Sequence, residues 1–147
     1  VTQNVDDLHQ RAGNPDAIRL HGDILASRWL DPCARRPAGC DIGRATGDVP
    51  PRCPDCGNLA RPGVVWFGEM LDEAALRAAA QAARASELMI VVGTSGVVWP
   101  AAGLAGEAAA AGATVVVLNP ARSELDDVAD ECLRGTAAQV LPRLFGA

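Results

Sequence analysis

Lysine is absent from this sequence, and all 13 basic residues are arginine. The phosphate-binding loop of P-loop NTPases requires a lysine, so that type of site is excluded. The Gly-x-Gly-x-x-Gly fingerprint of dinucleotide-binding domains is also missing. Neither standard nucleotide-binding motif applies, so any nucleotide site in this chain must be built from other residues.

Long apolar runs are missing as well. No segment approaches the ~18 to 20 uninterrupted apolar residues that a membrane helix needs. The first residues have neither the basic nor the apolar region of a signal peptide. We therefore expect a cytoplasmic protein that does not act at a membrane.

The charge balance limits the kinds of partner. The formal net charge is −5, which argues against broad nucleic-acid binding because such binding needs basic surface that displaces counterions from phosphates. The 147 residues are 49% hydrophobic, which is typical of a folded globular chain that can bury a core.

The short apolar runs alternate with alanine-rich segments. Residues 88–92 and 114–118 are typical of strands buried on both faces of a parallel sheet. Residues 72–87, capped by Asp72, and 101–111 have the composition of helices. This alternation predicts a doubly wound α/β sheet. We also expect a short helix between Asp6 or Asp7 and Gly13, strands at 17–20 and 63–67, helical structure at 124–134 and a terminal helix at 140–145.

Two turns follow the predicted strands. Gly93-Thr94-Ser95-Gly96 comes after the first, and Asn119-Pro120 after the second. Ligands of open α/β sheets bind beyond the carboxyl ends of the strands, and consecutive parallel strands bring their turns to one edge. Glycine backbone, hydroxyls and free amides suit ribose and phosphate. Alone, the first motif is equally consistent with an ordinary turn, and the second is more often just a turn.

His21 is the candidate general base. It follows a predicted strand and precedes Gly22, which keeps the backbone open around it. An imidazole can accept a proton near neutral pH, as a general base must. Without further context, a single histidine is more often a hydrogen-bonded core or surface residue.

The cysteines indicate a metal site. Cys53-Pro54-Asp55-Cys56-Gly57 has the spacing of a zinc knuckle, with Cys33 and Cys40 as possible partners at a less typical spacing. The surrounding residues 27–62 contain six prolines and no clear helix or strand periodicity, so zinc would supply the staple that this segment needs. Reduced thiols without metal are the alternative.

The chain resembles the NAD-dependent protein deacylases called sirtuins, in the bacterial and mitochondrial-type branch. The resemblance rests on six motifs in the family's order: residues 2–6 (Thr-Gln-Asn-Val-Asp), 20–22 (Leu-His-Gly), the two cysteine pairs, 65–69 (Val-Trp-Phe-Gly-Glu), 93–95 (Gly-Thr-Ser) and Asn119. It implies a Rossmann-like parallel α/β sheet with a small inserted zinc-ribbon module. Residues 1–27 and 63–147 would belong to the Rossmann-like domain, and 28–62 to the zinc module.

The resemblance also assigns roles to residues. His21 would be the catalytic base, and NAD the co-substrate. Zn²⁺ would be structural, with acylated-lysine proteins as substrates. The cofactor site would comprise Gln3, Asn4, Val5 and Asp6, then Gly93, Thr94 and Ser95, then Asn119, Pro120 and Ala121, and finally Ala137. The substrate would pair with Val64, Val65, Trp66, Phe67, Gly68 and Glu69, and the metal ligands would be Cys33, Cys40, Cys53 and Cys56.

The chain departs from the family pattern in two places. Trp29 stands where the family has its first cysteine. The family's first Rossmann strand and Gly-Ala-Gly loop would precede Val1, so we expect an N-terminally incomplete chain that is inactive by itself. An ADP-ribosyltransferase, a non-catalytic zinc-ribbon binding module and a hydride-transferring dehydrogenase are the alternatives, the last disfavoured by the missing glycine fingerprint.

Overall fold

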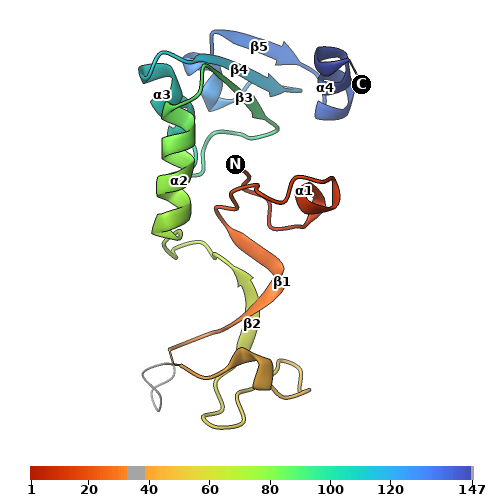
Figure 1. The fold of residues 1–147 in the computed structure, drawn as a ribbon, viewed down its shortest axis with the longest axis vertical. Coiled ribbons are helices and arrows are strands. Elements are labelled where there is room, and N and C mark those ends of the chain that lie inside the picture. The colour runs from red at the N-terminus through yellow and green to blue at the C-terminus, as the bar shows by residue number, and fades with distance from the viewer. Residues whose placement is uncertain (33–38, 147) are drawn as a thin grey trace. The chain divides into compact units, whose positions relative to one another are not determined.

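A computed structural model describes residues 1–32 and 39–146 of the chain. The chain divides into two compact units, Val1–Leu71 and Asp72–Ala147. Figure 1 shows the helices and strands of both units. Among the described helices, none is long and apolar enough to cross a membrane.

The second unit contains a three-stranded parallel sheet. The strand order is β3 (Leu88–Val92), β4 (Thr114–Asn119) and β5 (Glu131–Arg134). The helix α2 (Glu73–Arg84) precedes β3, and the helix α3 (Gly103–Ala110) connects β3 to β4. The predicted alternation of strands and helices is therefore confirmed, and Asp72 caps α2 by accepting a hydrogen bond from the Ala75 amide at 2.8 Å.

The core of this unit lies around β4. Val115, Val117 and Leu118 are at most 1% exposed, and Ala108 of α3 is fully buried. The expectation that residues 88–92 are buried on both faces is wrong for this structure, because Leu88 is 53% exposed. Within the described residues β3 has only β4 as a neighbour and forms an edge of the sheet.

The C-terminal part corrects two predictions. Residues 124–134 are helical only at their start, in the 3₁₀ helix η2 (Glu124–Val128), and then form β5. The change occurs at Asp130, whose backbone amide and side chain both bond to Val115, so that the chain joins β4 as a strand. The terminal helix α4 (Ala137–Phe145) begins before residue 140, because Gln139 caps the free Thr136 amide.

The first unit contains an antiparallel pair, β1 (Gly22–Trp29) and β2 (Ala60–Val64). The predicted strand at 63–67 therefore lies nearer to the N-terminus, and β1 was missed. A Cβ atom on Gly22 would lie 2.1 Å from the Gly63 carbonyl oxygen, so only glycine permits this approach of the strands. An irregularity between Asp23 and Ser27 breaks the strand register and explains the absent alternation.

The chain before β1 is held by few backbone contacts. The short helix α1 (Leu8–Arg11) follows Asp7 as predicted, and Gly13 adopts a left-handed φ of 85° after it. The strand predicted at 17–20 is reduced to a single bridge between Thr2 and Arg19, because only two hydrogen bonds join these segments.

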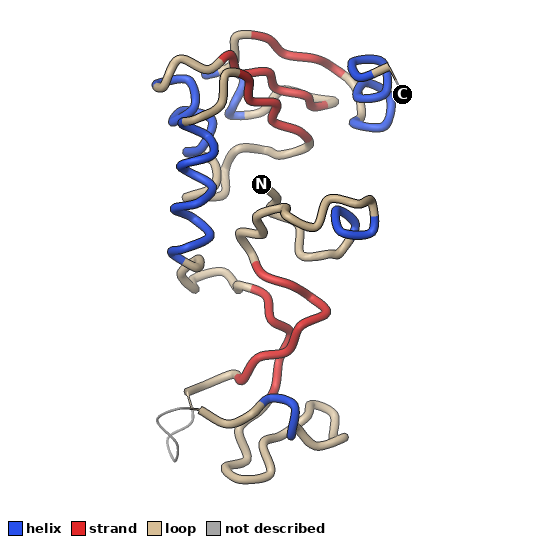
Figure 2. The backbone as a smooth tube through the Cα atoms, viewed as in Figure 1, coloured by secondary structure: helices blue, strands red, loops and turns tan. Residues whose placement is uncertain are grey.

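The described residues between β1 and β2 are almost entirely loop, apart from the short 3₁₀ helix η1 (Ile42–Arg44) (Figure 2). Such a segment buries little apolar surface of its own. The only fully buried cysteine in the described chain, Cys53, lies here.

Candidate functional site

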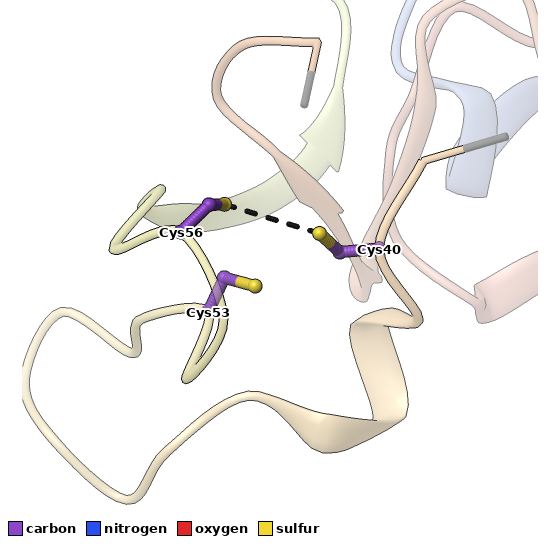
Figure 3. A group of neighbouring side chains, drawn as sticks. All are labelled: Cys40, Cys53 and Cys56. Carbon is purple, nitrogen blue, oxygen red and sulfur yellow. Dashed lines mark hydrogen bonds between the residues drawn. The ribbon is translucent and has the colours of Figure 1, made fainter. Parts of the chain in front are cut away.

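Three cysteines of the loop segment form one cluster. The sulfur atoms of Cys40, Cys53 and Cys56 all lie within 4.8 Å of one another (Figure 3). The turn that carries the second and third is closed by hydrogen bonds from the Gly57 amide to the Cys53 carbonyl and from the Cys53 amide to the Asn58 carbonyl. The predicted knuckle is therefore joined by Cys40, whereas Cys33 lies outside the described residues.

The surroundings of this cluster suit a metal. Burial opposes ionisation of Cys53, but the Asp55 and Cys56 backbone amides and the Cys40 and Cys56 side chains stabilise the thiolate, so the pKa of Cys53 lies below its usual 9.0. Thiolates are the ligands that structural zinc prefers. The Trp29 indole donates a 2.7 Å hydrogen bond to the Cys40 carbonyl, which fixes the backbone of one ligand. These three residues fit a zinc site in donor type and separation.

His21 directly precedes β1, and its backbone is bonded to the residue that follows β2. Its carbonyl accepts a 2.9 Å hydrogen bond from the Val65 amide, and its side-chain Nδ1 is buried without a partner in the described chain. The adjoining Leu20 amide bonds to the Thr2 carbonyl, so the histidine directly follows the bridge that holds residues 1–6. A buried imidazole nitrogen without a partner is consistent with a group that a ligand completes.

Residues 3–6 are placed by their backbone. The Ile24 amide donates to the Val5 carbonyl at 2.9 Å, and the Asn4 amide donates to the Thr2 hydroxyl at 3.1 Å. The Asp6 carboxylate accepts from the Leu8 amide at the start of α1. Asn4 is exposed, whereas Val5 and Asp6 are partly buried, as is Gln3.

The segment that begins at the last residue of β2, residues 64–69, is held by an arginine for which we predicted no role. Arg61 is only 6% exposed, and its guanidinium donates to the Val64 carbonyl at 2.8 Å and to the Glu69 carboxylate. The same guanidinium lies 4.1 Å from the centre of the Trp66 ring. An arginine in an apolar strand with a glutamate at the end of the next segment was the only sequence signal for this contact.

In the second unit, the two predicted turns meet at the carboxyl ends of β3 and β4. The Asn119 amide nitrogen donates a 2.7 Å hydrogen bond to the Thr94 carbonyl, and the Gly93 amide bonds to the Leu118 carbonyl at 3.0 Å. Asn119 is only 5% exposed, so its side chain joins the turns from within. The expectation that consecutive strands bring these residues to one edge holds in this unit.

The 3₁₀ helix η2 packs against the first of these turns. The Glu124 amide donates to the Ser95 carbonyl at 3.2 Å. Gly96 has a left-handed φ of 78°, and a Cβ atom on it would lie 2.6 Å from Leu125 Cγ. The turn at 93–96 is therefore fixed both by β4 and by η2.

An ion pair between a buried aspartate and a half-exposed arginine supports the second turn. Asp126, with a side chain 8% exposed, pairs with Arg134 of β5, which also donates to the Ala121 carbonyl at 3.0 Å. The Arg134 hydrogen bond, assisted by bonds from Ser123, holds the pKa of Asp126 below its usual value and raises that of Arg134. Pro120 is exposed next to it, and the Gly135 amide bonds to the Asn119 carbonyl just before Ala137 begins α4.

The structure thus gathers the predicted residues into two groups. Residues 3–6, His21 and 64–69 lie in the first unit together with the cysteine cluster, and residues 93–95, 119–121 and Ala137 lie in the second. Cys132 lies on β5, in the other unit from the cluster.

Comparison with known proteins identifies a family profile and several relatives that the chain matches. Residues 1–100 match the sequence profile described as the Sir2 family. The chain is 50% identical over 145 residues to the NAD-dependent protein deacylase of Ralstonia nicotianae, covering 99% of this chain and 57% of that protein. It is 49% identical over 150 residues to NAD-dependent protein deacylase 1 of Pseudomonas aeruginosa, covering 99% and 60% respectively.

Solved structures of Sir2 proteins also match this chain. A structure described as Sir2 with a p53 peptide and NAD⁺ superposes with a TM-score of 0.83 at 34% identity, over 99% of this chain and 60% of that one. A structure described as Sir2Tm bound to a propionylated peptide gives the same TM-score and identity, over 99% and 61%. The chain therefore spans about three-fifths of the length of the relatives it matches.

Proposed function

This chain belongs to the Sir2 family, and from that premise we propose that the protein is an NAD-dependent protein-lysine deacylase. The observation that carries the proposal is the setting of His21. Its backbone is bonded to Val65 at the start of the 64–69 segment, and its buried Nδ1 has no partner in the described chain. This setting supports a role for His21 as a base that acts beside the segment proposed to bind the acylated lysine.

The reaction would consume NAD as a co-substrate. The acyl oxygen of the lysine attacks the nicotinamide ribose and nicotinamide leaves. His21 accepts a proton from a ribose hydroxyl, whose oxygen attacks the acyl carbon, and the lysine amine leaves with a proton. A water molecule then adds to the acyl carbon and supplies the remaining oxygen, which gives O-acyl-ADP-ribose as the co-product. No hydride is transferred, which sets this activity apart from that of a dehydrogenase.

The proposed NAD-binding residues are those that the family resemblance assigns. Gln3, Asn4, Val5 and Asp6 would line the nicotinamide end. Gly93, Thr94 and Ser95 would bind ribose and phosphate, and Asn119, Pro120, Ala121 and Ala137 the adenosine end. The hydrogen bond between Asn119 and the Thr94 carbonyl supports this proposal, because it presents both turns at one sheet edge.

The substrate would lie along residues 64–69 as an added strand. Backbone hydrogen bonds would supply affinity with little sequence preference. Phe67 is 99% exposed, which supports the proposal that this segment is open to a partner. Proteins with acylated lysines are therefore the proposed partners.

Zinc would have a structural role. Cys40, Cys53 and Cys56 would be three ligands and Cys33 the fourth, in a module of residues 28–62 between two parts of a Rossmann-like domain, 1–27 and 63–147. The close approach of the three sulfurs supports the site. The cytoplasmic location expected from the sequence belongs to the same proposal, since reduced thiols are the normal state there.

The two histidines of the chain allow a matched test. The protein, at the full length at which its host makes it, is incubated with NAD and an acetyl-lysine peptide, and the deacylated peptide is measured by mass spectrometry. His21→Ala should lower turnover at least about a hundredfold, the usual contribution of a general base, while His9→Ala on α1 should not. Normal turnover by His21→Ala would refute the role of His21, and ADP-ribose attached to protein would favour the transferase alternative.

A further inference from the structure

The buried guanidinium of Arg61 touches three parts of the segment that follows it. It donates to the Val64 carbonyl at 2.8 Å and to the Glu69 carboxylate, and it lies 4.1 Å from the centre of the Trp66 ring. Its side chain is only 4% exposed. A charged group is kept in such a place only when its partners are fixed, so this arginine determines the shape of the segment.

Glu69 closes the same arrangement from the other end. One carboxylate oxygen accepts from Arg61, and the other accepts a 3.0 Å hydrogen bond from the Trp66 amide. The Glu69 amide returns a 3.0 Å hydrogen bond to the Trp66 carbonyl. The Arg61 hydrogen bond and the Trp66 amide hold the pKa of Glu69 below its usual value, which favours the ionised carboxylate.

These contacts leave a defined part of the backbone free. The Val65 amide is used by His21, and both backbone groups of Trp66 are used by Glu69. Within the described chain Phe67 and Gly68 form no hydrogen bond, and both are exposed. Gly68 has a left-handed φ of 88°, so the chain turns just before Glu69.

We propose that Arg61 and Glu69 are positioning residues that hold residues 64–68 in the conformation that receives the acylated peptide. This inference rests on the deacylase function proposed above. A peptide that adds as a strand needs backbone donors and acceptors at fixed positions, and ordering them in advance raises affinity because less conformational freedom is lost on binding. The clamp, meaning the side chains of Arg61 and Glu69, supplies that order by fixing the backbone of the segment.

Arginine is required at this position by its geometry. The guanidinium reaches a carbonyl and a carboxylate at once and stacks on an aromatic ring, whereas the single ammonium of lysine cannot keep all three contacts. Arg28 offers a natural comparison, because it also faces the Glu69 carboxylate but at 3.9 Å and from a half-exposed position. Its contact is too long to hold the segment.

The test is a steady-state comparison of Arg61→Lys with Arg28→Lys in the full-length protein. Arg61→Lys should raise the KM for an acetyl-lysine peptide about tenfold, with kcat and the KM for NAD within about threefold of wild type, because a charge-assisted hydrogen bond that orders the peptide site is lost. Arg28→Lys should leave all three constants unchanged. Glu69→Gln keeps an acceptor oxygen and should lie between wild type and Glu69→Ala.

A second readout does not depend on activity. Hydrogen exchange should show faster exchange of the Trp66 amide in Arg61→Lys and Glu69→Ala, with unchanged exchange in β1. An unchanged peptide KM in Arg61→Lys, or an equal loss in kcat and both KM values with global loss of protection, would overturn the clamp. Absence of turnover by the wild type would instead refute the proposed function itself.

Discussion

Replacement of Gly96 by alanine should destabilise the second unit through one identifiable contact. The backbone at Gly96 has a φ of 78°, a conformation that alanine adopts only with strain. The added Cβ would lie 2.6 Å from Leu125 Cγ and 3.2 Å from the Leu125 amide nitrogen. Leu125 is itself 7% exposed, so it has little room to move away.

The magnitude has two parts. A left-handed alanine costs about 1 to 2 kcal/mol. Forcing a methyl group into a packed contact costs about 1 to 3 kcal/mol more. The free energy of unfolding should therefore fall by roughly 2 to 5 kcal/mol, a large share of the ~5 to 15 kcal/mol typical of a domain.

Gly112 provides the matched control. It has a φ of 94°, and a Cβ on it would meet nothing within 4 Å. Gly112→Ala should therefore cost only the backbone part, about 1 to 2 kcal/mol. Urea unfolding followed by circular dichroism measures both variants, and calorimetry should show weaker NAD binding for Gly96→Ala, because the turn at 93–96 is displaced. Equal destabilisation by the two substitutions would refute the packing argument.

Three further predictions concern other parts of the chain. Cys56→Ser should lower the zinc content, measured by plasma mass spectrometry, well below about one ion per chain, while Cys132→Ser should not, and zinc-replete Cys56→Ser would contradict the ligand set. Because Arg134 depresses the pKa of Asp126 from 3.8, the stabilisation that Asp126→Asn removes should be constant from about pH 5 to 8 and vanish as the pH falls below 3.8; a difference that persists in acid would contradict the ion pair. Gly22→Ala should separate β1 from β2, since its Cβ would lie 2.1 Å from a backbone oxygen, and hydrogen exchange of β1 at the wild-type rate would rule this out.

The elements that could be predicted are those whose signal is local. β3, β4 and α2 have continuous apolar runs or a capped alanine-rich sequence, and each lies where the pattern indicated. β1 was not predicted because its side chains are mostly exposed and its register is interrupted. Burial therefore imposes no alternation of apolar and polar residues on this strand. β5 is only four residues long, and it is a strand because Asp130 ties it to β4, a contact that no local pattern encodes.

The candidate site divides in the same way. The meeting of Asn119 with Thr94 followed from a general property of parallel strands, so the sequence was sufficient. The sequence also predicted that Cys40 lies with the two knuckle cysteines, despite the unusual spacing between Cys33 and Cys40. The burial of Arg61 could not be predicted, because arginine is usually a surface residue. Only the fold brings together the carbonyl, the carboxylate and the aromatic ring that contact its guanidinium.

We propose that the full-length protein removes acyl groups from lysine at the expense of NAD. The most direct test is product analysis of the full-length protein with NAD and an acetyl-lysine peptide, with nicotinamide, deacylated peptide and O-acetyl-ADP-ribose measured in the same reaction. We predict that the three products form in equal amounts. Release of nicotinamide without deacylated peptide, or ADP-ribose attached to protein in place of O-acetyl-ADP-ribose, would contradict the claim.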